Sequence, residues 1–313
     1  MIAGEFVLLD VNALAGTNWD YEFHEICDLT KDVDEGRPGL SDYASKTKPL
    51  FAKLADRWSP ELHAEWLQRH YLCLKLIMGA TIQFGTAEHA HHHNLQMAVP
   101  YLSYYGMFNA VRANILSSPR SGWGKNSLTI GHEKAIDAYK REIKLLLSPE
   151  EVEAEISLFI QAKHGRELFS YRFPSNGAPG RGGFFVYPDE AERFARLAAE
   201  LALFNSFCLG AAIEKKFGRP GEWEGYHIRD RELSRMWKHV LKGTLGDDDY
   251  IHADSEDAYR VAKIARSLGQ PMPFVWMIGE GGVDSFFGAH GSTEDSEDEF
   301  NPDKHWNRLL ELP

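Results

Sequence analysis

Five polar side chains in the middle of the chain are of the types that cleave phosphodiester bonds in RNA. They are Arg112, His132, Arg166, Tyr171 and Arg172. A histidine can take the proton from a ribose 2′-hydroxyl, and arginines can stabilise the charge that a phosphate gains in the transition state. These residue types therefore predict a site that cleaves RNA without a metal ion, if the fold brings them together.

The same residues also allow a structural interpretation. In it, Arg112 is an exposed or ion-paired residue of a helix, His132 lies at a helix start, and Arg172 binds loop carbonyls. The two interpretations differ in one arrangement, because catalysis requires Arg112 and His132 to approach each other. Burial of these two side chains far apart would exclude the catalytic interpretation.

A run of histidines forms a second candidate site. His89 and His93 follow Glu88 in the sequence EHAHHH, and on a helix they lie one turn apart on one face, as in the HxxxH arrangement of zinc sites. Glu88 or a distant side chain would be the third ligand. Paired cysteines and the HExxH sequence are absent, so the alternative is a solvated polar turn, and no cofactor is predicted for the chain.

The elements that must position these residues are predicted to be helices. Apolar residues recur three and four positions apart over 100–115 and again over 132–147, which is the pattern of amphipathic helices. The sequence SSPRSGWGKNS between them favours a turn because it contains Pro, Gly and Ser. The prediction is a helical hairpin with Arg112 far along its first arm and His132 at the start of its second.

Capping signals mark several helix starts. Ser59 and Ser148 each precede a proline that suits the first helical position, and Ser148 forms a capping box with Glu151. The helix that begins at 149 loses its apolar pattern at Lys163, and the Gly- and Pro-rich segment after it predicts a loop. Further helices are predicted over 189–217, 229–242 and 255–268, short strands over 6–11 and 184–187, and a bend between helices over 80–94.

The predicted fold is mainly α, a helical bundle with additional helices at the C-terminus and few short strands. Residues 1–58 form an N-terminal extension, 59–218 the bundle core, and 219–313 a C-terminal helical extension. Within the last part, residues 291–299 are acidic and poor in apolar residues, which predicts a loop. With 313 residues, the chain is long enough to bury a sizeable core.

Composition limits the classes of function. The hydrophobic content of 43% and the charged content of 26% are typical of a globular protein. The chain contains no uncharged apolar run of 18 or more residues and its N-terminus does not resemble a signal peptide, so we expect a cytoplasmic protein without a membrane span. The net charge of −12 argues against broad, salt-driven binding of nucleic acid and leaves room for a local basic site.

In the central part of the chain, a helix that reads YYGMFNAVRANIL is followed by a loop, a helix that opens with GHEKAI, the sequence RELFSYR, and a long alanine-rich helix from Asp189. This order of motifs resembles that of the HEPN-like helical superfamily. The resemblance covers residues 95–217. It implies a helical bundle, and it implies a homodimer because such bundles commonly pair through their helices.

Many HEPN-like proteins are ribonucleases of phage-defence or toxin–antitoxin systems, and others bind nucleotides or protein partners. The resemblance therefore implies either RNA or a protein as partner. The ribonuclease signature of the family, an arginine followed after four to six residues by a histidine, is absent from 95–217, and the pair Arg57 and His63 lies outside this range. The alternative to an RNA-binding ribonuclease is a non-catalytic helical scaffold or regulatory subunit that binds a protein partner.

Overall fold

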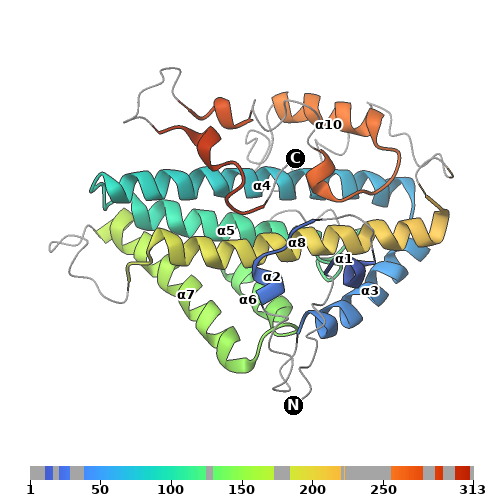
Figure 1. The fold of residues 1–313 in the computed structure, drawn as a ribbon, viewed down its shortest axis with the longest axis horizontal. Coiled ribbons are helices and arrows are strands. Elements are labelled where there is room, and N and C mark those ends of the chain that lie inside the picture. Colours follow the sequence, from blue (N-terminus) through green and yellow to red (C-terminus); the bar gives the residue numbers. More distant parts are fainter. Residues whose placement is uncertain are drawn as a thin grey trace, which may run out of the picture.

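The computed structural model describes residues 11–16, 21–28, 39–124, 130–172, 184–219, 222, 255–277, 286–291 and 300–310 (Figure 1). In these residues the fold is a bundle of helices without a strand, which confirms the mainly α prediction. The α-helices are α1 Val11–Ala15, α2 Glu25–Asp28, α3 Leu40–Asp56, α4 Pro60–His92, α5 Val99–Ser117, α6 His132–Ile143, α7 Pro149–Glu167, α8 Pro188–Phe217 and α10 Ser255–Ser267. A π-helix, η2 (Leu168–Arg172), continues α7, and two 3-10 helices, η3 (Phe274–Met277) and η4 (Pro302–His305), lie near the C-terminus.

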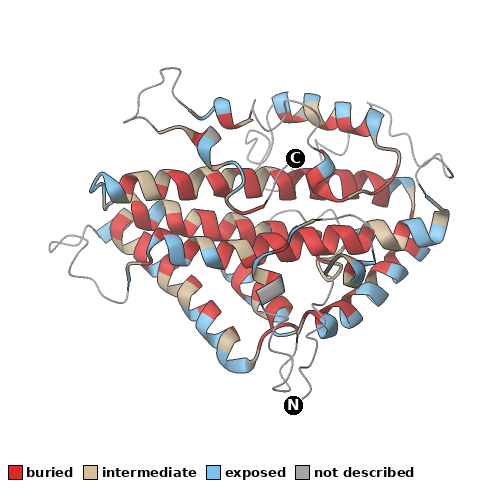
Figure 2. Ribbon diagram, viewed as in Figure 1, coloured by how far each residue is buried: buried red, intermediate tan, exposed pale blue. Residues whose placement is uncertain are grey.

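Three long helices form the centre of the bundle. Helix α5 packs against α4 on one side and α8 on the other, and the three run side by side in Figure 1. Because it is covered on several sides, α5 is buried along most of its length (Figure 2) and is apolar nearly all round. The predicted hairpin exists, since α6 contacts α5, but α5 packs mainly against the other two helices.

Helices α4 and α5 approach closely because Gly106 has no side chain. A Cβ atom at this position would lie 2.6 Å from the ring of Phe84 on α4. The ring is fully buried, and it occupies the space that a larger residue on α5 would take. This contact brings the backbones of the two helices together in the core.

The predicted capping signals are confirmed. The side chain of Ser59 accepts a hydrogen bond from the backbone N–H of Leu62 at the start of α4. Ser148 and Glu151 form the expected capping box of α7. Helix α8 ends at Gly218, whose φ of 97° is a conformation that side-chain-bearing residues rarely adopt.

The bend predicted over 80–94 is wrong, because α4 continues as one helix to His92. The glycine in this stretch serves packing instead. A Cβ atom at Gly85 would lie 3.0 Å from the ring of His305, so the missing side chain lets η4 pack closely onto α4. A glycine at this position looks the same in the sequence whether it serves a bend or such a contact.

The loop predicted from Lys163 and the strand predicted over 184–187 are also wrong. Helix α7 continues to Glu167 and then widens into η2, so Arg166 and Tyr171 lie on helices. The apolar pattern stops at Lys163 because several side chains beyond it face the candidate site and solvent. Residues 184–186 are not in regular structure, and no strand lies beside them in the described part of the chain.

Helix α8 is long and apolar enough, by length and composition alone, to cross a membrane. In this fold 78% of its most apolar window is buried inside the protein. It packs against α5 and α3, and a helix in the centre of a core needs the same composition. The packing therefore accounts for the apolar character of α8.

The C-terminal part packs onto α4 through polar contacts. The hydroxyl of Tyr71 donates to Asp257 of α10 over 2.5 Å, and Lys75 is ion-paired with the same carboxylate. Near the other end of α4, Arg308 is ion-paired with Glu88 at 2.5 Å. The predicted helix over 229–242, the acidic residues 292–299 and the predicted strand over 6–10 lie outside the described residues, and residue 11 begins α1.

Candidate functional site

Helix α5 presents three side chains in a row on the face that contacts α6 and α7. Tyr104, Phe108 and Arg112 are four residues apart, so they lie one helical turn above one another. The rings of Tyr104 and Phe108 are stacked with their centroids 6.0 Å apart. The guanidinium carbon of Arg112 lies 5.6 Å from the centroid of the Phe108 ring.

His132, the first residue of α6, packs onto this row. The centroid of its ring is 4.3 Å from that of Phe108, and its Nδ1 is 2.6 Å from the hydroxyl of Tyr104. Arg112 and His132 thus contact the same phenylalanine ring, so they do not lie far apart. His132 is partly exposed, which leaves the ring accessible to a ligand.

Arg166, near the end of α7, lies among three tyrosines. Its guanidinium carbon is 5.1 Å from the ring centroid of Tyr104 and 5.7 Å from those of Tyr105 and Tyr171. Its Nη1 donates to the hydroxyl of Tyr171 over 3.2 Å. The wide turn of η2 brings Tyr171, five residues further on, back towards Arg166. The buried Nε of Arg166 has no hydrogen-bond partner among the described residues, so the guanidinium has not used all its donors.

The protonation of His132 follows from its surroundings. Burial lowers the pKa of His132 below the ordinary histidine value, and three positive neighbours lower it further. These neighbours are Arg166, Lys163 and Arg112. Glu133 opposes them, but it is ion-paired with Lys163. The imidazole is therefore neutral at pH 7 and can accept a proton.

The contact between Tyr104 and His132 has two chemically distinct forms. Burial raises the pKa of Tyr104, so its hydroxyl keeps its proton at neutral pH. Either this hydroxyl donates to Nδ1 of His132, or Nδ1–H donates to the phenol oxygen. In the second form Nε2 carries a free lone pair, which is the form required of a general base.

Four of the five side chains predicted from the sequence lie together in this cluster. They are Arg112, His132, Arg166 and Tyr171. Arg172 is exposed where η2 ends, and no contact among the described residues joins it to the cluster. Sequence reasoning missed Tyr104 and Lys163. Tyr104 could have been found from its spacing, since it lies two turns before Arg112 on the same helical face.

The histidine run forms the last turn of α4. The rings of His89 and His93 are stacked, with centroids 4.0 Å apart and planes inclined by 29°. Nδ1 of His93 lies 2.8 Å from the carbonyl oxygen of His89, to which it can donate. Stacked rings direct their nitrogens side by side rather than towards one point. In the described part of the chain, no group of three or more His, Cys, Asp or Glu side chains is placed to hold a metal ion.

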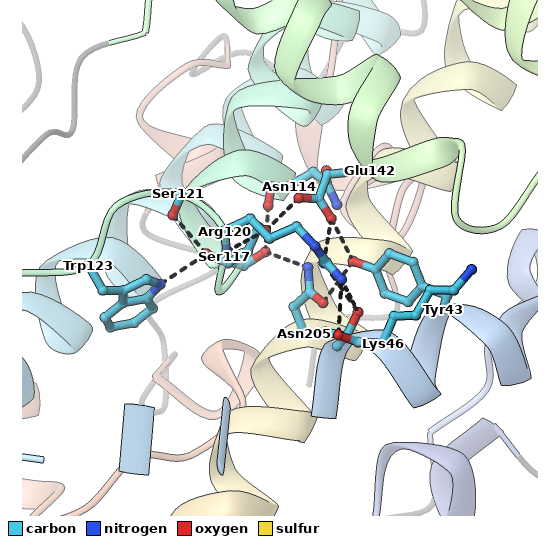
Figure 3. Close-up of polar contacts among 11 residues, drawn as sticks. Tyr43, Lys46, Asn114, Ser117, Arg120, Ser121, Trp123, Glu142 and Asn205 are labelled. Atoms are coloured by element: carbon cyan, nitrogen blue, oxygen red, sulfur yellow. Dashed lines mark hydrogen bonds and ion pairs between the residues drawn. The ribbon is translucent and has the colours of Figure 1, made fainter. Parts of the chain in front are cut away.

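A second polar cluster surrounds the buried carboxylate of Glu142 on α6 (Figure 3). Its Oε1 accepts from the hydroxyl of Ser118 over 2.7 Å, and its Oε2 lies 3.1 Å from Nη1 of Arg120. The hydroxyl of Tyr43 lies 3.2 Å from the same Oε2 and 2.9 Å from Oδ1 of Asn205. Residues of α3 and of the α5–α6 connection therefore meet at the Glu142 carboxylate of α6, and Tyr43 links α8 to it through Asn205.

This cluster holds the structure together and leaves little for a substrate to bind. Both oxygens of Glu142 have partners, and burial together with the negative charge of Glu142 raises the pKa of Tyr43. Arg120 also donates to the hydroxyl of Thr47 and the carbonyl of Lys46, both on α3. A buried network in which both carboxylate oxygens are paired fixes the relative positions of the elements that contribute to it.

A buried ion pair on α4 fixes the same connection from the other side. Nε of Arg69 lies 2.8 Å from Oε1 of Glu65. Nη1 of Arg69 donates to the carbonyl of Leu116 over 3.1 Å and to the hydroxyl of Ser121 over 2.8 Å. The N–H of Gly124 donates to Oε2 of Glu65 over 2.7 Å. The chain between the end of α5 and Gly124, on the way to His132, is thus anchored to α4.

Comparison of the chain with protein-family models, with curated proteins and with solved structures finds no match. A proposal of function for this chain therefore rests on the chemistry and geometry of its side chains.

Proposed function

We propose that the protein is a HEPN-like endoribonuclease of a defence or toxin-type system, and that it cleaves RNA without a metal ion. The observation that supports this most is the neutral, partly exposed imidazole of His132 beside three cations and the phenol of Tyr104. A phosphate is attracted by the cations, and the imidazole is then close enough to act as a base. The order of helices that resembles HEPN-like proteins agrees with this proposal.

The reaction starts with the ribose 2′-hydroxyl. Nε2 of His132 takes its proton while Nδ1–H donates to Tyr104, and the 2′-oxygen attacks the phosphorus. Negative charge accumulates on the phosphate oxygens, and the guanidinium of Arg166 stabilises it together with that of Arg112. These groups are held in place before the substrate arrives, because the tyrosine and phenylalanine rings fix them.

The bond from phosphorus to the 5′-oxygen then breaks. The hydroxyl of Tyr171 accepts a hydrogen bond from Arg166, and its O–H can donate a proton to the leaving 5′-oxygen. Water afterwards removes the proton from His132 and restores that of Tyr171. The products are a 2′,3′-cyclic phosphate and a 5′-hydroxyl end, and the site returns to its starting state.

A cleavage assay tests this proposal. Purified protein is incubated with a mixed RNA pool, with and without EDTA, beside His132→Ala, Arg166→Ala and Arg112→Ala. Wild-type protein is expected to cleave in EDTA and to leave cyclic phosphate ends. Loss of a general base lowers the rate about 10²- to 10⁴-fold, so His132→Ala should be nearly inactive.

The matched control is His290→Ala, which removes an exposed histidine of the C-terminal segment 286–291. It is expected to cleave as fast as wild type. Intact RNA after incubation with folded wild-type protein contradicts the proposal. Cleavage that EDTA abolishes contradicts its metal-independent form and directs attention to His89 and His93.

A second candidate function is a non-catalytic scaffold or regulatory subunit that binds a protein. The observation that favours it is the turn between α4 and α5, where the aliphatic side chains of Leu95 and Met97 are 57% and 45% exposed. Exposed aliphatic groups of this size are typical of protein interfaces when they cluster. Light scattering tests the homodimer that both candidates allow. If the wild-type protein has the mass of a dimer and the double variant Leu95→Glu, Met97→Glu has the mass of a monomer, an interface at this turn is supported. A wild-type protein with the mass of a monomer contradicts it.

A further inference from the structure

Large exposed side chains gather at one end of the bundle, where α4 ends and α5 and α8 begin. Nine large hydrophobic or aromatic side chains are exposed among the described residues, and six belong to this end. The six are Leu95, Met97, Tyr101, Tyr171, Phe184 and Tyr187. A Cβ atom at Gly165 of α7 would overlap the carbonyl oxygen of Phe184 and lie 3.8 Å from Pro100, so these elements are in direct contact (left in Figure 1).

The tyrosines of this end form a row that leads to His132. Tyr101 and Tyr105 are one turn apart on α5, and their ring centroids are separated by 4.7 Å. The ring of Tyr105 is in turn 6.3 Å from that of His132. Tyr171 lies on the other side, beside Arg166. An exposed aromatic surface therefore continues directly from the cations and the imidazole of the candidate site.

We propose that Tyr101, Tyr105 and Tyr171 form a platform on which unpaired bases stack while the neighbouring phosphate lies at His132. This inference rests on the proposed function and names its substrate class, which is single-stranded RNA. Every base has a flat π-face that stacks on an aromatic ring, and arginine and lysine beside the rings bind the backbone phosphates.

The charge of the site favours this occupant over an apolar protein surface. Arg166 lies beside these rings, and its buried Nε has no hydrogen-bond partner among the described residues, so a hydrophobic partner would leave this donor unpaired. An RNA strand supplies one phosphate for each base, so it satisfies the cations and the rings together. A duplex cannot use the platform, because its bases are already stacked on one another and paired.

The test measures binding separately from cleavage. A short fluorescent 2′-O-methyl oligonucleotide, which lacks the attacking hydroxyl, is titrated with protein as a single strand and as a duplex with its complement. Wild-type protein is expected to bind the single strand more tightly than the duplex. Stacking of one base on an aromatic ring corresponds to about 5- to 100-fold in affinity, so Tyr101→Leu should weaken single-strand binding by that factor and Tyr101→Trp should preserve it.

Tyr187→Leu is the matched control. Tyr187 is 50% exposed and Tyr101 is 48% exposed, but the ring of Tyr187 lies 5.2 Å from Phe185 and is not part of the row. This variant is expected to bind like wild type, and thermal unfolding shows whether each variant is folded. Equal binding of single strand and duplex, or equal losses in Tyr101→Leu and Tyr187→Leu, overturns the platform.

The outcomes also separate the platform from the proposed function. Binding that depends on Tyr101 in a protein that leaves natural RNA intact supports the platform and contradicts the ribonuclease. Cleavage that His132→Ala abolishes, with the same rate on single-stranded and duplex RNA, supports the ribonuclease and overturns the platform. Absence of any binding to RNA overturns the platform outright.

Discussion

The pKa of His132 depends on the charges that surround its imidazole. In the free protein burial and then its cationic neighbours lower the pKa of the imidazole, and in the proposed reaction the same cations attract the phosphate. In the proposed reaction the negative charge of the bound phosphate offsets those cations, so the pKa of His132 is expected to rise on binding. The proposed general base would then be stronger when the substrate has bound, which is when a proton must be removed.

The pH dependence of cleavage should report the pKa of His132. The neutral imidazole is the active form, so kcat/KM is expected to fall as acid protonates His132, with a midpoint below the ordinary histidine value. Lys163→Gln removes one cation and frees the carboxylate of Glu133, and both changes raise the pKa of His132. The midpoint of the acid limb should therefore move to higher pH in this variant.

Lys140→Gln is the control for this shift. Lys140 is ion-paired with Glu153 at 2.5 Å, and this pair also joins α6 to α7. It is not among the groups that act on His132. The acid limb of the pH profile of cleavage should be the same in Lys140→Gln as in wild type. An unshifted acid limb in Lys163→Gln would argue against the assignment of His132 as the titrating group.

At the scale of elements, the contact between α7 and the segment before α8 depends on Gly165. An added Cβ would overlap the backbone oxygen of Phe184, which cannot move aside as a flexible side chain can. Gly165→Ala should therefore displace the two elements and lower the free energy of unfolding by about 1–3 kcal/mol, measured by urea denaturation. The neighbouring Arg166 should shift with α7, so cleavage should fall as well.

Gly79→Ala provides the comparison within a helix. Gly79 lies inside α4, and a Cβ atom there would have no atom within 4 Å. Alanine has the better helix propensity, so this variant should be more stable by up to about 1 kcal/mol. Equal effects of the two alanines would show that helix propensity, and not the approach to Phe184, determines the result at Gly165.

The starts of the helices that Ser59 and Ser148 cap were predictable because capping is local in sequence. The approach of Arg112 to His132 was predictable from the hairpin alone. The extension of α7 into η2 was not predictable. Lys163, Arg166 and Tyr171 interrupt the apolar pattern there because their side chains contact other elements. The partners of Glu142 were also beyond reach, since the pattern around a residue does not show what lies 99 positions away in the chain.

At the scale of the whole molecule, the Glu142 cluster connects elements that are far apart in sequence. Glu142→Gln keeps the size of the side chain but removes the charge that pairs with Arg120, and the amide cannot accept all the same hydrogen bonds. Loss of one partner of a buried pair costs about 3 kcal/mol, somewhat less here because Arg120 is 25% exposed. Urea denaturation should show this loss, with reduced cleavage because the chain leading to His132 is less well held.

Glu153→Gln is the control for this loss. This variant removes the carboxylate of α7 that is ion-paired with Lys140 of α6, but the Glu153 side chain is largely exposed. Exposed ion pairs contribute little, so its unfolding curve should overlie that of wild type. A loss in Glu142→Gln no larger than that in the control would contradict the structural role of the cluster.

The residues of the Glu142 cluster are far apart in sequence, and this separation matters while the chain is being synthesised. Tyr43 contacts Asn205, which lies 162 residues later, and α8 covers α5. The ribosome has already made all the proposed catalytic residues when it reaches residue 172, but the helix that completes their support has not yet been translated. A nascent chain is therefore expected to lack an ordered site at that stage, and an enzyme that cuts RNA would leave its own messenger intact until α8 is complete at Phe217, when more than two-thirds of the 313 residues have been translated.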